Sequence, residues 1–217
     1  MDDLERYAAQ HLDKNAFDYY STGAGDDVTT ARKIDKLLKA YQGMAHPDGE
    51  LATVRAVNSM DTAMGLSIYS TNSLEDVALE SPNTIKFMQM QFYKDRQFME
   101  SLLKRAEKAG YKAVLLTLDI PTYGRHIGRA NFFLPEHLEF ANFLSWKKKE
   151  GLRNNEEMND HITSLNDGSV DWETFDWLRS ITSLPFVVKG ILTAEDARLA
   201  VQHGAQGIWC QITEGGS

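Results

Sequence analysis

The chain has 217 residues, 42% of them hydrophobic and 25% charged, which is ordinary for a soluble globular protein with one sizeable core. Its formal net charge of -8 argues against a nucleic-acid-binding protein, because phosphate recognition requires a basic surface. No apolar run approaches the roughly 20 residues that span a bilayer, and the acidic amino terminus is unlike a signal peptide. We therefore expect a single-domain cytoplasmic protein with no membrane or nucleic-acid partner.

The first forty residues predict helices interrupted by a turn. Apolar residues recur at helical spacing from Leu4 to Leu12, and a second apolar set begins at Phe17. The segment STGAGDD, residues 21–27, then breaks the pattern. Its two glycines lack the preceding strand and the third glycine of a dinucleotide-binding loop. We interpret it as a turn whose aspartate, Asp26 or Asp27, caps a helix that extends to about Tyr41.

From residue 65 onward, short apolar runs alternate with amphipathic stretches, as in repeated βα units. The predicted strands are residues 64–69, 84–91, 112–119, 185–190 and 206–210. A helix is predicted within residues 94–110, with Gly110 as its stop and an apolar face of Phe98, Leu102, Leu103 and Ala106. A second helix, within residues 193–204, is expected to be capped by Thr193 and closed by Gly204.

Apolar strands in βα units imply a parallel sheet covered by helices, which is either an open doubly wound sheet or a (β/α)8 barrel. Most of the predicted strands end in polar side chains that could serve a ligand. These residues are Ser67 and Tyr69, Gln89 and Gln91, Thr117 and Asp119, and Lys189. Because a barrel has its active site on this rim, the pattern favours an α/β fold of the TIM-barrel type preceded by N-terminal helices.

The polar region from Pro135 to Ser169 is too long for a tight βα connection and predicts an excursion or a mobile lid. Within it, the basic run from Lys147 to Lys149 lacks apolar periodicity and is interpreted as a solvated loop. No metal site is predicted, because the six histidines are scattered and the single cysteine, Cys210, is expected to be buried and inert. No GxSxG motif supports a serine nucleophile.

Six collinear segments are similar to the FMN-dependent 2-hydroxy-acid oxidases, the family of glycolate oxidase and lactate oxidase. They are FDYYSTGAGDD, MAHPDGELATVRA, LSIYSTNSLEDVA, QFYKDR, YKAVLLTLDIPTYG and LRSITSLPFVVKGILTAEDARLAVQHGAQGI. Together they cover most of the chain. The resemblance implies a TIM barrel, FMN as cofactor, and oxidation of small (S)-2-hydroxy acids to 2-oxo acids with O2 as acceptor.

The resemblance also implies a cofactor site. Ser67, Gln89, Thr117 and Lys189 would line the FMN isoalloxazine ring. The charge of Lys189, beside flavin N1 and the C2 carbonyl, would stabilise the anionic reduced ring. Without the motifs, we would expect the hydroxyls of Ser67 and Thr117 to bond to neighbouring backbone groups. The side chains of Gln89 and Lys189 would be expected to reach solvent.

Further residues are implied to act on the substrate. The hydroxyl of Tyr19 would bind the substrate carboxylate, and Tyr69 would be an aromatic of the same pocket. Asp119 matches an aspartate that orients the base histidine, so its role depends on a partner. Read without the motifs, both tyrosines would be assigned to the core.

Several positions depart from the family pattern. Gln91 replaces a tyrosine that contacts the substrate oxygen. The family has an arginine after the glycine that matches Gly124, and this arginine helps close over the substrate. In this chain that role could fall to Arg125, His126 or Arg129, and we expect His126 to bind the substrate.

Two whole segments of the family pattern have no match. Near residue 42 the chain lacks a few tens of residues with the first barrel strand. After GIWC it lacks the base histidine, the substrate-binding arginine and the C-terminal strands, which in the family hold the FMN phosphate. We therefore expect one FMN hydroxy-acid dehydrogenase-type domain over residues 1–217, as an incomplete barrel with exposed strand edges and weak FMN binding.

Three hypotheses follow for the function. The chain is a competent oxidase that takes its missing parts from another chain, a non-catalytic partner or FMN-binding remnant, or a non-functional fragment. The expected ligand is a small 2-hydroxy or 2-oxo acid, and a homo-oligomer stays open. Family analogy suggests peroxisomes for a full-length parent, whereas the lack of an SKL-type signal predicts the cytoplasm for this form.

Overall fold

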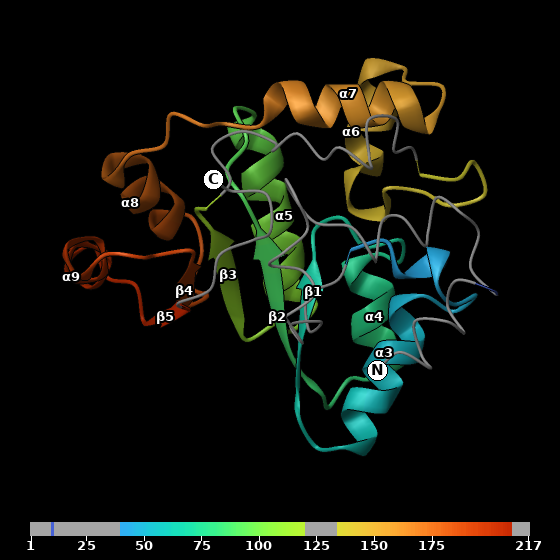
Figure 1. The fold of residues 1–217 in the computed structure, drawn as a ribbon, viewed down its shortest axis with the longest axis horizontal. Helices are drawn as coiled ribbons and strands as arrows, with labels where there is room; N and C mark the ends of the chain where they lie inside the picture. The colour runs from blue at the N-terminus through green and yellow to red at the C-terminus, as the bar shows by residue number, and fades with distance from the viewer. Residues whose placement is uncertain (1–9, 11–39, 120–133, 210–217) are drawn as a thin grey trace.

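The computed structural model describes residue 10 and residues 40–119 and 134–209 (Figure 1). The strands are β1 Ala63–Ser67, β2 Ile85–Met90, β3 Ala113–Thr117, β4 Phe186–Lys189 and β5 Gly207–Trp209. The α-helices are α3 Glu50–Ser59, α4 Leu74–Glu80, α5 Arg96–Lys108, α6 Leu144–Glu150, α7 Asn155–Leu165, α8 Trp172–Ser180 and α9 Ala194–Gln202. Two short 3-10 helices are η2 Gln42–Met44 and η4 Ala141–Phe143.

The five strands form one parallel sheet in the order β1-β2-β3-β4-β5. Four predicted strands contain an observed one, and β1 begins one residue before the predicted range of residues 64–69, so the strand predictions are confirmed. A doubly wound sheet reverses its strand order at a switch point, whereas a barrel adds each βα unit beside the last. In the described part of the chain the order never reverses, which is the arrangement of successive barrel units.

The two faces of the sheet differ in burial. Residues paired in register share a face, and one face carries Leu66, Met88 and Leu116, each 0% exposed. These side chains belong to the apolar cluster that includes buried residues of α3, α4, α5 and α8. Phe87 and Val187 lie on the opposite face and are only partly buried. The helix-facing side is therefore the packed core, as on the outer surface of a barrel sheet.

Two helices form as the sequence predicts. The Asp95 carboxylate accepts a hydrogen bond from the Phe98 amide at 3.0 Å and caps α5, and Gly110 follows the helix at φ 83°. The predicted apolar face of α5 is fully buried. In α9 the cap is Thr193, whose hydroxyl accepts from the Asp196 amide at 3.0 Å.

The helix predicted to extend to about Tyr41 is not tested. Tyr41 has φ 58°, in the left-handed region, and precedes η2. Its amide donates to the carbonyl of Tyr69 at 3.3 Å, so the backbone here runs beside the end of β1. The helix predicted before it lies outside the described residues.

The region from Pro135 to Ser169 is an excursion between β3 and β4 that contains η4, α6 and α7, which is one of the two sequence interpretations. The expectation that its basic run is a loop is wrong. Lys147 to Lys149 form the last turn of α6. The indole of Trp146 packs on Phe98 with ring centroids 4.0 Å apart, and its Nε1 donates to Asp95 at 2.9 Å. Figure 1 shows α6 and α7 at the top of the view and α8 and α9 beside β4 and β5. Apolar contacts with α5 therefore hold this region in place.

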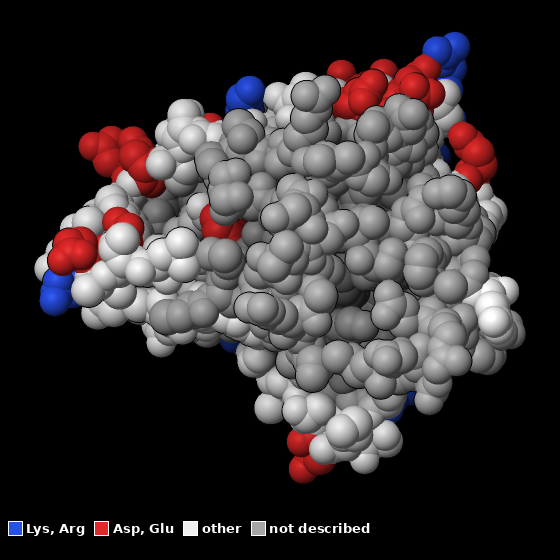
Figure 2. Space-filling model, in the orientation of Figure 1, with Lys and Arg blue, Asp and Glu red and all other residues white. Residues whose placement is uncertain are grey.

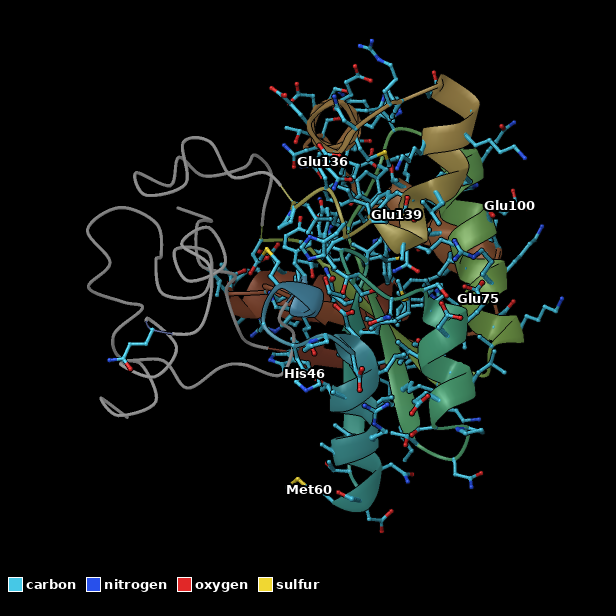
Figure 3. The ribbon with its side chains drawn as sticks, turned by 90° about the vertical axis from the view of Figure 1, so that its right-hand side faces the viewer. His46, Met60, Glu75, Glu100, Glu136 and Glu139 are labelled. Carbon is cyan, nitrogen blue, oxygen red and sulfur yellow. The ribbon has the colours of Figure 1, made fainter. Side chains whose placement is uncertain are left out.

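Helix α4 packs between α3 and α5, and in Figure 3 α3 is in the middle of the view with α4 and α5 to its right. There the carboxylate of Glu75 accepts two hydrogen bonds from Arg105, at 2.7 and 2.9 Å, which links α4 to α5. This pairing lowers the pKa of Glu75. Met60, at the end of α3, is 75% exposed. None of the described helices is long and apolar enough to cross a membrane.

Candidate cofactor site at the carboxyl ends of the strands

The strand register brings the four predicted FMN residues to one edge of the sheet. Ser67 pairs with Gln89 between β1 and β2, and Thr117 pairs with Lys189 between β3 and β4. The Gln89 amide nitrogen donates to Thr117 Oγ1 at 3.0 Å and joins the two pairs. Each of these side chains is at or near the carboxyl end of its strand, on the face opposite the helices, where Ser67, Thr117 and Lys189 are buried and Gln89 is partly buried. This is where parallel barrel strands present ligand-binding groups.

The amide and hydroxyl groups at this edge are held in defined orientations. Gln89 Oε1 accepts from the Ile68 amide at 3.3 Å, and Ser67 Oγ accepts from the Tyr69 amide at 3.2 Å. Within the described ranges, neither the Ser67 nor the Thr117 hydroxyl donates to a protein acceptor. Both can therefore donate to acceptor atoms of a ligand, such as the ring nitrogens and carbonyls of a flavin.

Lys189 is buried and ion-paired. Its Nζ lies 3.2 Å from Asp119 Oδ2, and the side chains of Lys189 and Asp119 are 6% and 3% exposed. The simple expectation of a strand-end lysine reaching solvent is therefore wrong. The resemblance assigned Asp119 to a histidine, whereas among the described residues it pairs with this lysine.

Tyr69 and Gln91 belong to a hydrogen-bonded network next to the candidate FMN residues. The Tyr69 hydroxyl accepts from Gln91 Nε2 at 2.9 Å and from the Tyr93 hydroxyl at 3.0 Å. Gln91 Nε2 also donates to Asn166 Oδ1 at 2.9 Å. Tyr93 and Asn166 form an antiparallel bridge, so the residues after α7 are fixed to those after β2.

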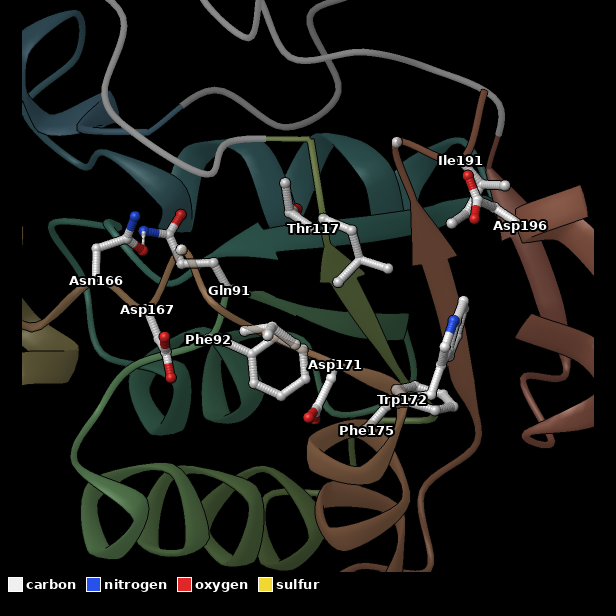
Figure 4. A pocket seen from close by; sticks show the side chains of 14 residues that line it. Gln91, Phe92, Thr117, Asn166, Asp167, Asp171, Trp172, Phe175, Ile191 and Asp196 are labelled. Carbon is white, nitrogen blue, oxygen red and sulfur yellow. Dashed lines mark hydrogen bonds between the residues drawn. The ribbon is translucent and has the colours of Figure 1, made fainter. Parts of the chain in front are cut away.

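A cavity of about 300 Å³ opens at the same rim (Figure 4). Gln91 and Thr117 connect it to the groups described above, and Asn166 lies beside Gln91. Its remaining lining is mixed, with aromatic side chains and carboxylates. These are Phe92, Trp172 and Phe175, together with Asp167, Asp171 and Asp196. A small organic molecule with an apolar part fits a cavity of this size and lining.

The acidic composition is visible on the surface. Figure 2 shows carboxylates in several groups on the face it draws, with few lysines or arginines among the described side chains there. No group of three or more histidine, cysteine or acidic side chains in the described part of the chain could hold a metal ion. Tyr19, Arg125, His126, Arg129 and Cys210 lie outside the described residues, so these predictions stay untested.

Comparison with known proteins identifies the family. The family model "FMN-dependent dehydrogenase" matches residues 37–211. The chain belongs to this family. It is 38% identical to 2-hydroxyacid oxidase 1 of Mus musculus, over 96% of this chain and 67% of that protein. It is also 38% identical to glycolate oxidase of Spinacia oleracea, over 96% of this chain and 66% of that protein.

A solved structure extends the similarity to the fold. Mandelate oxidase with (S)-4-hydroxymandelic acid matches with a TM-score of 0.79 and 30% identity, covering 95% of this chain and 68% of that one. The fold is thus a partial TIM barrel, as predicted. The chain spans about two thirds of the length of these family members. Its alignment with the mouse protein extends over 248 residues, more than the 217 of this chain, so the mouse protein has residues in this interval without counterpart here.

Sequence reasoning missed two parts of the site. It did not include Asn166, which sits in a polar stretch with no motif, nor Tyr93, although Tyr93 is within the QFYKDR match. The position of Tyr93 three residues after β2 ends was the available signal, because residues that follow a barrel strand lie at the ligand rim.

Proposed function

We propose that this chain binds FMN at the rim formed by Ser67, Gln89, Thr117 and Lys189. The observation that carries the proposal is the Gln89 to Thr117 hydrogen bond, which joins residues from separate strands at one edge. Two hydroxyl donors, an amide and a buried ammonium group match the acceptor-rich edge of an isoalloxazine ring. Family membership supports the choice of FMN.

The proposed chemistry is that of the family, oxidation of a small 2-hydroxy acid to a 2-oxo acid. Bound FMN would supply the acceptor for the hydride equivalent. Lys189 would place a positive charge where negative charge develops on reduction. Tyr19, from the amino-terminal segment, would bind the substrate carboxylate, and Tyr69 would be an aromatic of the same pocket. Gln91 would offer an amide where the family has a tyrosine.

We further propose that the 217-residue chain alone is a poor oxidase. Residues 210–217, which follow β5, contain no histidine, and the resemblance gives the base histidine to that segment. Loss of a positioned base lowers rates by about 10²–10⁴. His126, a surface histidine by interpretation, is a weak substitute. We propose that residues 1–217 form one domain that lacks the first barrel strand and the C-terminal strands. Because the segment that would hold the FMN phosphate is among the missing parts, FMN binding should be weak.

The test uses purified protein titrated with FMN and followed by its visible spectrum. Weak, saturable binding that is reduced in Lys189→Met is expected, with the exposed Lys148→Met of α6 as the matched control. Equal binding by both variants would overturn the assigned cofactor site. Tight, stoichiometric retention of FMN through gel filtration would contradict only the prediction that FMN binds weakly.

Turnover is tested separately under anaerobic conditions. FMN-loaded protein is mixed with excess glycolate, lactate or mandelate, and flavin bleaching is followed. No bleaching is expected for the chain alone. Bleaching that disappears in His126→Ala would show that the chain is competent and that His126 is its base.

A further inference from the structure

Among the ion pairs of the described residues, the one between Lys189 and Asp119 is the most deeply buried. The two charged atoms are 3.2 Å apart, and neither side chain is more than 6% exposed. At such low exposure, solvent screens the two charges only weakly. A ligand at this edge therefore experiences the lysine together with its carboxylate, not an isolated ammonium group.

The backbone enforces this pairing. The Leu118 amide donates to the Lys189 carbonyl at 2.9 Å, which aligns the residues just beyond β3 with β4. Gly190 has φ 96°, and a Cβ added there would lie 2.5 Å from Asp119 Cβ. Asp119 thus occupies the space that any larger residue at position 190 would need. The backbone therefore holds the Asp119 carboxylate beside the Lys189 ammonium group.

We propose that Asp119 is a positioning residue that fixes the Lys189 ammonium group at the FMN rim and partly cancels its charge there. The proposal rests on the proposed function and deepens it. A lone buried lysine would favour the negatively charged reduced cofactor strongly. The paired lysine favours the reduced cofactor less. FMN bound to this chain should therefore have a lower midpoint potential than FMN beside an unpaired lysine.

The experiment compares the midpoint potential of FMN bound to the full chain in the wild type, Asp119→Asn and Asp160→Asn. Asp160 is an exposed residue of α7, so its variant removes the same charge away from the rim. In Asp119→Asn the equilibrium for two-electron reduction should shift toward reduced FMN by about tenfold, or about 30 mV upward. Asp160→Asn should leave the potential unchanged. A potential that is unchanged or lower in Asp119→Asn would overturn the proposal.

A second measurement tests the interaction between Asp119 and Lys189 in the protein without cofactor. Thermal unfolding of the cofactor-free wild type, Asp119→Asn, Lys189→Met and the double variant forms a double-mutant cycle. Each single variant should unfold at a lower temperature, and the double variant should regain part of the loss. Strictly additive losses would overturn the positioning role. Absence of bound flavin in the wild type would instead overturn the proposed function and the redox effect with it.

Discussion

The side-chain amide of Gln89 donates a 3.0 Å hydrogen bond to the hydroxyl of Thr117, across the boundary between β2 and β3. Because the hydroxyl accepts this bond, its own hydrogen is available to an acceptor atom of a ligand. The backbone amide of Ile68 fixes the other end of the glutamine amide. The donor groups at the proposed cofactor site are therefore ordered before any ligand arrives, which reduces the entropy cost of binding.

Replacing Thr117 by valine should weaken FMN binding without unfolding the protein. The valine keeps the shape, removes one ligand donor and leaves the Gln89 amide without its acceptor. The loss of one net hydrogen bond, about 0.5–1.5 kcal/mol, corresponds to a roughly twofold to tenfold higher Kd. Fluorescence titration with FMN measures it. Thr163→Val, which removes an exposed hydroxyl bonded to the Asn159 carbonyl, is the control and should bind FMN like the wild type.

Asn142 should be a large contributor to stability. It is 0% exposed, its Nδ2 donates to the Ile68 carbonyl and to Ser70 Oγ, and its Oδ1 accepts from the Leu74 amide. Asn142→Ala leaves these buried groups without their hydrogen-bond partner. It should lower the free energy of unfolding by about 2–4 kcal/mol in urea denaturation. Asn159→Ala, on a less buried part of α7, should change it by less than about 0.5 kcal/mol. Equal effects would refute the structural role of Asn142.

The strands were predictable from sequence because each is an apolar run with its own flanking helix, and parallel pairing then fixes their order. Helix α6 was not predictable in the same way. It has seven residues and buries only Trp146. One buried residue gives no repeat of apolar positions from which a helix could be predicted. Its position depends on contacts with Phe98, which lies far away in the chain.

The candidate site was predictable only in part. Strand ends identified Ser67, Gln89 and Thr117 because position in a barrel strand determines position on the rim. The partner of Asp119 was not predictable, since Lys189 is 70 residues away and the family motif directed attention to a histidine. Pairing of charges depends on side-chain geometry across two strands, which no local pattern contains.

Lys86 should make stability depend on pH in the alkaline range. Its Nζ is buried and donates to the carbonyls of Ser81 and Thr84 at 2.6 and 2.8 Å. Burial, and to a lesser degree the charge of Lys112, lower its pKa below the usual 10.5. The folded protein then loses this proton at lower pH than the unfolded chain does, so the free energy of unfolding rises with pH through that window.

The comparison with Lys86→Met isolates this effect. As the pH rises toward the usual lysine pKa of 10.5, the stability of the wild type should improve relative to the variant, as measured by urea unfolding at each pH. Tyr111 has a pKa raised by burial and produces the opposite slope above its usual value, but it is present in both proteins and cancels. A difference between the two proteins that stays constant with pH would contradict the prediction.

Gly190 and Gly110 provide a matched test of the close approach at the rim. Both have positive φ, 96° and 83°, so alanine at either position strains the backbone by about 1–2 kcal/mol. A Cβ at Gly110 meets nothing within 4 Å, whereas one at Gly190 meets Asp119 Cβ at 2.5 Å and its backbone nitrogen at 2.9 Å.

Gly190→Ala should therefore be less stable than Gly110→Ala by a further 1–3 kcal/mol or so, because a packed backbone must shift to relieve the contact. It should also lose FMN binding, since the shift displaces Asp119 and with it Lys189, while Gly110→Ala should bind FMN like the wild type. Urea denaturation and FMN titration of the two variants measure both quantities. Equal stability losses would mean that the Asp119 segment yields freely, and the rim would then not hold its ion pair as rigidly as the geometry indicates.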